Sequence, residues 1–231
     1  MKSFEVRLIE CELCGTDTLT CRFERPAGYG FVPGQYAVFT LETIEGAVGK
    51  PFSLAAAPGD PYLEVTTRLS GSAFKRELRE LEPGGSVRIS AAAGRLVLPQ
   101  EVAHVTFLVG GVGITPARSM LRDAMQQSSG LSALLVYGSR DESCIAYREE
   151  LEQMRPHGIR VVHVLEAPGD DWQGHRGFIT ADTIRSLTDT DGPELYVVAG
   201  PPAMVDAMDS CLDALGVPAS RRMVERFSGY R

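Results

Sequence analysis

The stretch HVTFLVGGVGITPARSML, residues 104–121, decides how this chain is expected to fold. An apolar, partly β-branched run ends in three glycines within four residues, and an amphipathic pattern follows. This order predicts a buried strand, a tight turn and a new helix, with Thr115 at the N-cap and Pro116 in the first helical position. The N–H groups and dipole of such a helix end favour an anion, usually phosphate. The spacing is not G-x-G-x-x-G, so an ordinary strand–helix turn remains the alternative.

The same alternation fills the second half of the chain. Strands are predicted at 104–110, 131–139, 159–166 and 194–200, and helices at 115–129, 146–155, 180–188 and 202–216. Alternating strands and helices predict a doubly wound parallel α/β sheet. The stretch GPPAM, residues 200–204, repeats the order of strand, glycine, proline and helix. Ligands on such sheets bind beyond the carboxyl ends of the strands, so the second turn favours the phosphate site.

The first half has a different pattern. Short strands are predicted at 4–13, 18–26, 36–43, 50–56, 62–69 and 86–92, separated by turn residues. Only residues 72–85 have helical character, with Ser72 as the cap and Pro83-Gly84 as the stop. Short strands in this density predict a small antiparallel β-barrel. We therefore expect two domains, residues 1–99 and 100–231, with the boundary near Pro99.

Composition narrows the class of protein. The chain has 231 residues, is 44% hydrophobic and 23% charged, and carries a formal net charge of −7. This is an ordinary composition for a water-soluble globular protein, without a basic block for nucleic acid. No run approaches the roughly 20 apolar residues that span a bilayer, and the N-terminus has no apolar signal-peptide region. We expect a cytoplasmic protein that binds neither nucleic acid nor membrane.

The five cysteines are expected to be reduced thiols. Residues three apart on a strand point to opposite faces, which makes Cys11 and Cys14 poor joint metal ligands. The hairpin about Thr16 could instead set Cys11 opposite Cys21, and buried thiols are favoured over a metal there. The four histidines show no ligand spacing. No metal and no iron–sulfur cluster is expected.

Six short motifs stand in one order along the chain: FVPGQY (31–36), KPFS (50–53), GSAF (71–74), GGVGITP (110–116), GPPAM (200–204) and ERFSGY (225–230). Together they resemble the ferredoxin–NADP reductase family, and the resemblance runs over nearly the whole chain. It implies a flavin-binding barrel joined to a nicotinamide-nucleotide domain, with FAD and NADP or NAD as cofactors.

The resemblance assigns the barrel motifs to the flavin. In the family an Arg-x-Tyr-Ser segment lies along the flavin, with the Ser hydroxyl near N5, the Tyr ring over the isoalloxazine and the Arg on the phosphate. Here Ser53 matches, Phe52 keeps the ring without the phenol, and Lys50 keeps the charge without the planar fork. The other flavin-binding residues that it implies are Pro51, Arg68, Gly71, Ser72 and Ala73.

The remaining motifs are assigned to the nicotinamide nucleotide. The residues expected at its pyrophosphate, ribose and nicotinamide are Gly111, Val112, Gly113, Thr115, Pro116, Gly200, Pro201, Pro202 and Met204. Ser139, Arg140, Tyr147 and Arg148 lie around the end of the second strand of this domain, where a hydroxyl and arginines suit a 2′-phosphate. Asp141 and Glu142 follow, and an acidic group would suit a free ribose diol. NADP is therefore favoured over NAD.

At the C-terminus, Glu225 matches a family carboxylate near the nicotinamide and flavin N5, where it can relay a proton or stabilise charge. Phe227 or Tyr230 corresponds to the aromatic residue that covers the flavin. Where the family often has Cys before the Gly-Pro-Pro segment, this chain has Ala199. Hydride transfer needs no thiol, so Ser53 and Glu225 are the predicted catalytic residues.

The predicted function is a flavin-dependent NAD(P)H oxidoreductase that passes electrons to a ferredoxin, a flavodoxin or an oxygenase component. Two alternatives remain. One is an NAD(P)H:flavin reductase that uses free flavin as substrate, which Lys50 and Phe52 motivate. The other is an electron-transfer subunit that needs a partner chain.

Overall fold

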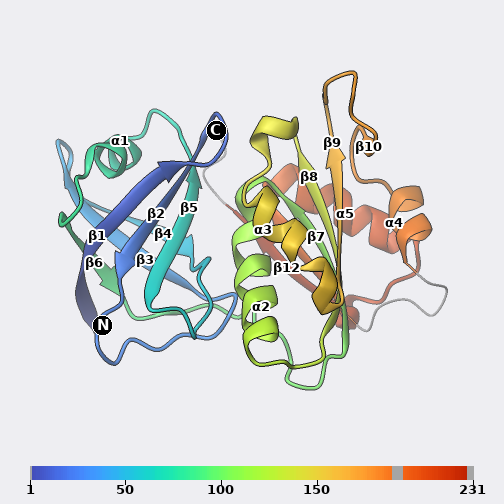
Figure 1. Cartoon of the computed structure of the whole chain (residues 1–231), viewed down its shortest axis with the longest axis horizontal. Coiled ribbons are helices and arrows are strands. Elements are labelled where there is room, and N and C mark those ends of the chain that lie inside the picture. The colour runs from blue at the N-terminus through green and yellow to red at the C-terminus, as the bar shows by residue number, and fades with distance from the viewer. Residues whose placement is uncertain (1, 189–194, 228–231) are drawn as a thin grey trace.

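Two sheets, each with its own core, lie side by side in the computed structural model, which describes residues 2–188 and 195–227 (Figure 1). In the described residues the first sheet is antiparallel, with strand order β4-β3-β6-β1-β2-β5. Its elements are β1 (Ser3–Leu13), β2 (Thr18–Glu24), β3 (Tyr36–Thr43), β4 (Gly46–Ser53), β5 (Tyr62–Arg68), α1 (Ala73–Glu80) and β6 (Ser86–Ser90). The end strands β4 and β5 also contact one another, so the sheet curves into a barrel.

The barrel forms because its strands alternate inward apolar and outward polar side chains. Phe23, Phe39 and Ile89 fill its interior and are at most 1% exposed. Helix α1 begins where the sequence predicts: the Ser72 hydroxyl accepts a hydrogen bond from the Lys75 N–H at the N-cap. The helix buries Phe74 against the same core and so closes one end of the barrel.

The second sheet is parallel, with strand order β10-β9-β8-β7-β11-β12 among the described residues. Its strands are β7 (His104–Gly110), β8 (Ser132–Ser139), β9 (Ile159–Leu165), β10 (His175–Arg176), β11 (Leu195–Gly200) and β12 (Arg222–Arg226). Its α-helices are α2 (Ile114–Gln126), α3 (Arg148–Gln153), α4 (Ala181–Leu187) and α5 (Pro202–Ala214). Short 3₁₀ turns lie at Gly111–Gly113, Glu142–Cys144, Arg155–His157 and Ala219–Arg221.

Helices cover both faces of this sheet. Ile114 of α2 and Leu151 of α3 pack on one face, and Ile184 of α4 and Val205 of α5 pack on the other. Figure 1 shows α2 lying between its sheet and the barrel. The two-domain fold class, an antiparallel barrel followed by a doubly wound α/β sheet, is confirmed.

The start of α2 corrects the sequence prediction. Thr115 is not the N-cap and Pro116 is not the first helical residue, because a 3₁₀ turn over Gly111–Gly113 leads directly into a helix that begins at Ile114. The Thr115 hydroxyl donates to the Val112 carbonyl instead. The glycines therefore form the first helical turn themselves. The sequence pattern of strand, turn and helix cannot distinguish this arrangement from a simple loop.

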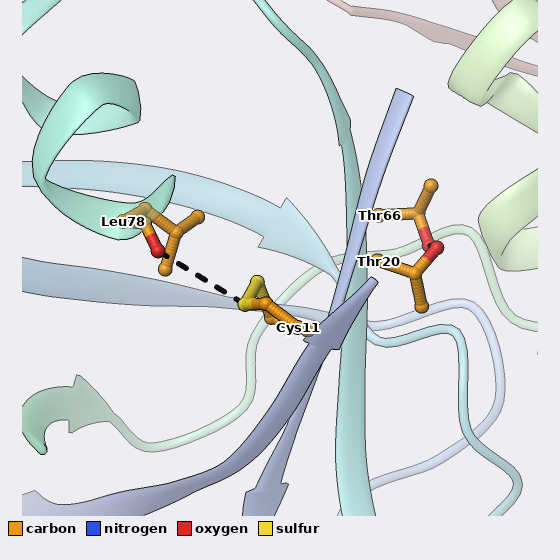
Figure 2. Close-up of a disulfide and its surroundings, with 5 residues drawn as sticks. Cys11, Thr20, Thr66 and Leu78 are labelled. Atoms are coloured by element: carbon orange, nitrogen blue, oxygen red, sulfur yellow. Dashed lines mark hydrogen bonds between the residues drawn. A yellow bond between two sulfur atoms is a disulfide. The ribbon is translucent and has the colours of Figure 1, made fainter. Parts of the chain in front are cut away.

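The cysteine prediction is half right. Cys11 and Cys21 are directly opposite in the β1–β2 pairing, as the hairpin predicts. They are not reduced thiols, because the structure joins them in a disulfide beside the Leu78 carbonyl of α1 (Figure 2). An odd cysteine count argued for free thiols, but the facing register of two strands decides which pair can form a bond.

Strand β12 is not among the predicted elements, because no strand is predicted after residue 200 and the motif at residues 225–230 is assigned only to the site. It pairs in parallel with β11, so that Glu225 lies level with Ala199. In the described part of the chain no helix is long and apolar enough to cross a membrane. The boundary near Pro99 stays a prediction.

Candidate active site between the two sheets

A cavity of about 920 Å³ opens between the barrel and the parallel sheet. The barrel contributes its β4 end, the end of β5 and the loop before α1, and the second domain contributes the first turn of α2 and the end of β12. The lining residues are Tyr36, Gly49, Lys50, Pro51, Phe52, Ser53, Thr66, Thr67, Arg68, Leu69, Ser70, Gly71, Ser72, Lys75, Val112, Thr115, Glu225, Arg226 and Phe227. Segments far apart in the sequence thus meet at one place.

The lining carries a cluster of cations contributed by the barrel. Lys50, Arg68 and Lys75 all line the cavity. Burial lowers the pKa of Lys75, and the positive charges of Lys50 and Arg68 lower it further, which shows that the three groups lie within electrostatic reach. Lys75 also donates to the Arg68 carbonyl over 2.6 Å, and Arg68 pairs with Asp17 over 2.8 Å. Three cations at the start of α1 form a site for an anion such as a phosphate.

An aromatic and hydroxyl surface also lines the cavity. Phe52 packs between Phe39 and Phe74, with ring centroids 5.9 Å and 5.6 Å apart. The core therefore fixes its ring, and Phe52 also lines the cavity. Ser53, 7% exposed, follows it on the same strand. Neighbouring side chains on a strand point to opposite faces, but Phe52 and Ser53 both line the cavity because β4 ends there.

The second domain approaches the cavity through tightly packed glycines. A Cβ on Gly113 would lie 2.1 Å from the Ala199 carbonyl oxygen, which is backbone that cannot move aside cheaply. Gly200 has φ +158° and accepts a hydrogen bond from the Phe227 N–H through its carbonyl. These contacts bring the ends of β7, β11 and β12 together and set Val112 at the cavity wall.

Glu225 reaches the cavity from β12. Burial raises the pKa of its carboxyl above the usual range of glutamate, and no neighbouring charge opposes this effect strongly enough to reverse it. The group therefore holds its proton at a pH at which an exposed glutamate would have lost it. Such a carboxyl, in a cavity that Ser53 also lines, is suited to hold or transfer a proton.

Eleven of the predicted site residues meet at this cavity: Lys50, Pro51, Phe52, Ser53, Arg68, Gly71, Ser72, Val112, Thr115, Glu225 and Phe227. Eight others do not line it and lie at the start of α1, in the turn before α2 and its first residues, at the end of β11 and at the start of α5: Ala73, Gly111, Gly113, Pro116, Gly200, Pro201, Pro202 and Met204. Tyr230 lies outside the described residues.

The residues predicted to select the nucleotide do not line the cavity. Ser139 ends β8 with a buried hydroxyl that has no hydrogen-bond partner in residues 2–188 and 195–227. Arg140 pairs with Asp141 over 3.1 Å, and Arg148 lies over the Trp172 ring. These three residues surround the carboxyl end of β8, where ligands of parallel sheets bind.

Tyr147 does not belong with these three residues. Its side chain does not face a nucleotide, because its hydroxyl is bonded to Glu64 and Thr66 of the barrel and its ring lies under Arg118. Sequence spacing placed it near Arg148 but could not show that the chain turns there through φ +61°.

Several cavity residues were missed, including Tyr36, Thr66, Thr67, Ser70 and Lys75. The sequence clue to these residues is that they neighbour predicted ones. Tyr36 ends the motif FVPGQY, and the others stand in the run TTRLSGSAFK, residues 66–75, around Arg68 and Gly71. Among the described residues no group of three or more histidine, cysteine, aspartate or glutamate side chains is arranged to hold a metal ion.

The residues present fit a flavin dinucleotide. The cavity offers cations for phosphate, an aromatic side chain fixed by the core, a hydroxyl and a carboxyl, and its volume lies at the upper end of the usual range for ligand pockets. The carboxyl ends of β7 and β11, where ligands of parallel sheets bind, are the place at which a nicotinamide nucleotide would lie.

Comparisons with known proteins agree with this geometry. Residues 107–210 match the family model described as "Oxidoreductase NAD-binding domain". The ferredoxin–NADP reductase B of Sorangium cellulosum (strain So ce56) is 31% identical over 238 residues, covering 97% of this chain and 97% of that protein. The reductase component of the naphthalene 1,2-dioxygenase/salicylate 5-hydroxylase systems of a Ralstonia species is 32% identical, but the alignment covers 81% of this chain and only 57% of that protein.

Solved structures share the fold. A ferredoxin NADP⁺ reductase from Neisseria gonorrhoeae, crystallised with bound FAD and NADP, superposes with a TM-score of 0.86 over 98% of this chain and 99% of that one, at 17% identity. That identity supports the fold alone. The family assignment therefore rests on the relative that is 31% identical over 97% of both chains. The chain belongs to the ferredoxin–NADP reductase family.

Proposed function

We propose that this protein is a flavin-dependent NAD(P)H oxidoreductase that passes electrons to a protein acceptor. The observation that carries the proposal is the cavity between the two sheets, where the Lys50, Arg68 and Lys75 cations, the Phe52 ring and the Glu225 carboxyl share a wall with the first turn of α2. When bound there, a flavin accepts a hydride from a reduced nicotinamide at N5 and releases the two electrons one at a time.

The chain's own residues bind, orient and manage a proton. Lys50, Arg68 and Lys75 hold the anionic part of the flavin, and the N–H groups at the start of α1 assist them. Ser53 is placed on β4 to hydrogen-bond the reacting edge. Glu225, with its raised pKa, holds a proton on the opposite wall.

The acceptor we propose is a ferredoxin, a flavodoxin or an oxygenase component. The proteins named for ferredoxin and for dioxygenase systems among the relatives support this class. Ser139, Arg140 and Arg148 favour NADPH over NADH, because cationic and hydroxyl groups at the end of β8 suit a 2′-phosphate. The cytoplasmic location stays a prediction.

One observation favours the second candidate, a reductase of free flavin. Lys50 and Arg68 are exposed, and Lys50 stands where a bidentate arginine would hold phosphate more firmly. A flavin held by exposed point charges leaves more readily, because water competes for these contacts.

The test is the visible absorption spectrum of the purified protein, recorded anaerobically before and after equal additions of NADPH and NADH. A bound-flavin spectrum that bleaches within the mixing time supports the main proposal, and the faster nucleotide gives the preference. A colourless protein that bleaches only added flavin, with saturation, supports the free-flavin reductase. Retained flavin that neither nucleotide bleaches would refute the oxidoreductase proposal.

A further inference from the structure

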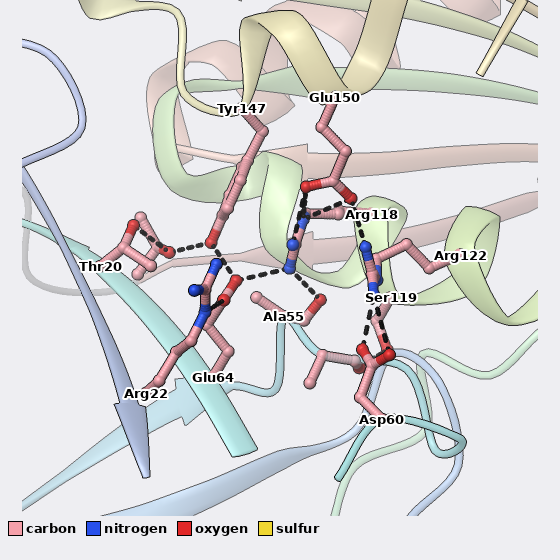
Figure 3. Close-up of polar contacts among 12 residues, drawn as sticks. Thr20, Arg22, Ala55, Asp60, Glu64, Arg118, Ser119, Arg122, Tyr147 and Glu150 are labelled. Carbon is pink, nitrogen blue, oxygen red and sulfur yellow. Dashed lines mark hydrogen bonds and ion pairs between the residues drawn. The ribbon is translucent and has the colours of Figure 1, made fainter. Parts of the chain in front are cut away.

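A buried network of charged side chains joins the two domains beside the cavity (Figure 3). Barrel residues contribute Arg22, Asp60 and Glu64, and the second domain contributes Arg118, Arg122, Tyr147 and Glu150. Glu64 has no exposed side-chain surface and Arg118 has 1%. The outer face of β2 and β5, which a free barrel would leave in water, is therefore buried against α2 and Tyr147.

Arg118 is the centre of this network. One terminal nitrogen donates to the Ala55 carbonyl over 2.7 Å and to the Glu64 carboxylate over 2.5 Å. Its other nitrogens donate to Glu150 of α3 over 2.8 to 3.1 Å. Its guanidinium also lies 4.0 Å from the centre of the Tyr147 ring. One side chain thus links α2 and α3 with two separate segments of the barrel.

Stability alone is a poor explanation for this arrangement. Taking two charges out of water is costly, and apolar residues of similar size at such places often stabilise a protein as well or better. What a planar guanidinium adds is a fixed direction for each of its bonds. The network therefore specifies how the domains are oriented more than how tightly they hold together.

The contacts of Arg118 lead directly to both walls of the cavity. Ala55 stands two residues after Ser53, and the next carbonyl, that of Ala56, accepts a 2.6 Å bond from the Ser119 hydroxyl. On the other wall, Thr115 lies on α2 three residues before Arg118, which places both on the same helix face.

Tyr147 makes a second link of the same kind. Its hydroxyl donates to Glu64 over 3.0 Å and is also bonded to Thr66, which lines the cavity. Thr66 is bonded in turn to Thr20 on the neighbouring strand. Tyr147 therefore holds the barrel wall at Thr66 against the second domain.

We propose that Arg118, supported by Glu64 and Tyr147, is a positioning residue that sets the gap between the flavin wall at Ser53 and the nicotinamide wall at Val112 and Thr115. This inference rests on the proposed function. Transfer between two bound rings requires reacting atoms about 3–3.5 Å apart, and a misplacement of about 1 Å reduces the rate up to about 100-fold. A fixed inter-domain fork supplies that accuracy from outside the cavity.

The experiment compares wild type with Arg118→Lys, which keeps the charge but loses the fork, and with Tyr147→Phe, which removes only one hydroxyl. Arg25→Lys is the matched control, because within residues 2–188 and 195–227 the Arg25 guanidinium donates to barrel carbonyls, those of Tyr29, Pro58 and Asp60, and to no group of the second domain. Stopped-flow bleaching at saturating NADPH or NADH gives the transfer rate, and titration gives the flavin Kd. Dithionite reduction followed by ferricyanide reoxidation tests the flavin without nucleotide.

A further readout needs no cofactor: hydrogen exchange of backbone amides in the apoprotein, followed at residues 54–57 and 112–119. The expected result for Arg118→Lys is a bleaching rate about 10- to 100-fold lower. The flavin Kd should stay within about twofold, the ferricyanide rate unchanged, and amide exchange faster at both segments. Tyr147→Phe should show the same changes in smaller degree, and Arg25→Lys should bleach at the wild-type rate.

Wild-type bleaching rates in both Arg118→Lys and Tyr147→Phe would overturn the positioning role. So would a parallel loss of flavin affinity and ferricyanide rate, which indicates general damage to the fold. Should Arg118→Lys fail to fold, Tyr147→Phe alone decides between these outcomes. A wild-type flavoprotein that neither nucleotide bleaches would refute the proposed function, and the positioning role with it, and this result is distinct because it appears before any substitution.

Discussion

Replacing His163 by leucine should remove a large part of the acid sensitivity of the second domain. His163 lies on β9, is 7% exposed and packs with its ring 5.9 Å from that of Tyr137. Neither ring nitrogen has a hydrogen-bond partner in the described part of the chain. The pKa of this imidazole is lowered from 6.5 to about 4, mainly by burial and also by the charges of Arg148 and Arg155, with Glu152 opposing them.

The direction in which stability changes with pH follows from proton linkage. Between pH 6.5 and 4 the unfolded chain binds a proton at His163 that the folded protein does not, so stability falls as the pH falls. At pH 5 the loss relative to pH 8 is about 2 kcal/mol, and it approaches about 3 kcal/mol below pH 4, at 1.36 kcal/mol for each unit of pKa difference. Leucine does not titrate, so the variant lacks this loss.

Urea unfolding at pH 8 and pH 5 measures the difference. Trp172 is the sole tryptophan and packs against the core of the same domain, so its fluorescence follows the unfolding that matters. Acid also destabilises the protein through partly buried carboxylates such as Glu150, whose pKa Arg118 and Arg122 lower despite the opposing effect of burial, but both proteins share that effect. His163→Leu should lose about 2 kcal/mol less than wild type between the two pH values. Equal losses in the two proteins would refute the assignment of a buried neutral histidine.

Three further predictions concern the site and the barrel. Lys50→Ala removes one of three clustered cations, so the Kd for FAD, measured by flavin fluorescence, should rise about tenfold; an unchanged Kd would show that Lys50 does not contact the flavin. Gly113→Ala sets a Cβ 2.1 Å from the Ala199 carbonyl oxygen and should lower the free energy of unfolding by about 1–3 kcal/mol in urea, whereas wild-type stability would contradict the close packing of this turn. Reduction of the Cys11–Cys21 disulfide should raise the number of alkylated thiols from three to five by mass and destabilise the barrel by about 3 kcal/mol. Five alkylated thiols before reduction would show that the bond is absent.

Much of the fold follows from local pattern. The alternation of strands and helices after residue 103, the capped helix at Ser72 and the glycine-rich strand ends predicted both domains and most of the elements. The start of α2 was misplaced, because Thr115 and Pro116 look like helix-start residues while the packing of Gly113 on β11 moves the first turn forward. Strand β12 was missed because its pairing with β11 is a contact between distant parts of the chain.

The site divides in the same way. The family resemblance of the motifs identified Ser53, Val112 and Glu225, and all three line the cavity. The network around Glu64 and Arg118 gave no such signal. A glutamate on a barrel strand and an arginine on an amphipathic helix both look like exposed residues until the two domains meet.

The sequence by itself determined the kind of protein: two domains, a flavin-type barrel, a nucleotide-type sheet and the strand ends at which ligands bind. The two-domain layout and the strand ends follow from hydrophobic period and turn chemistry, which are local, and the flavin and nucleotide assignments follow from the family resemblance that the motif order carries. Only the tertiary structure decided which polar residues are buried between the domains, that Tyr147 turns toward the barrel, and that Cys11 bonds Cys21. The reason is physical: burial and pairing depend on which surfaces meet, and that depends on the whole chain at once.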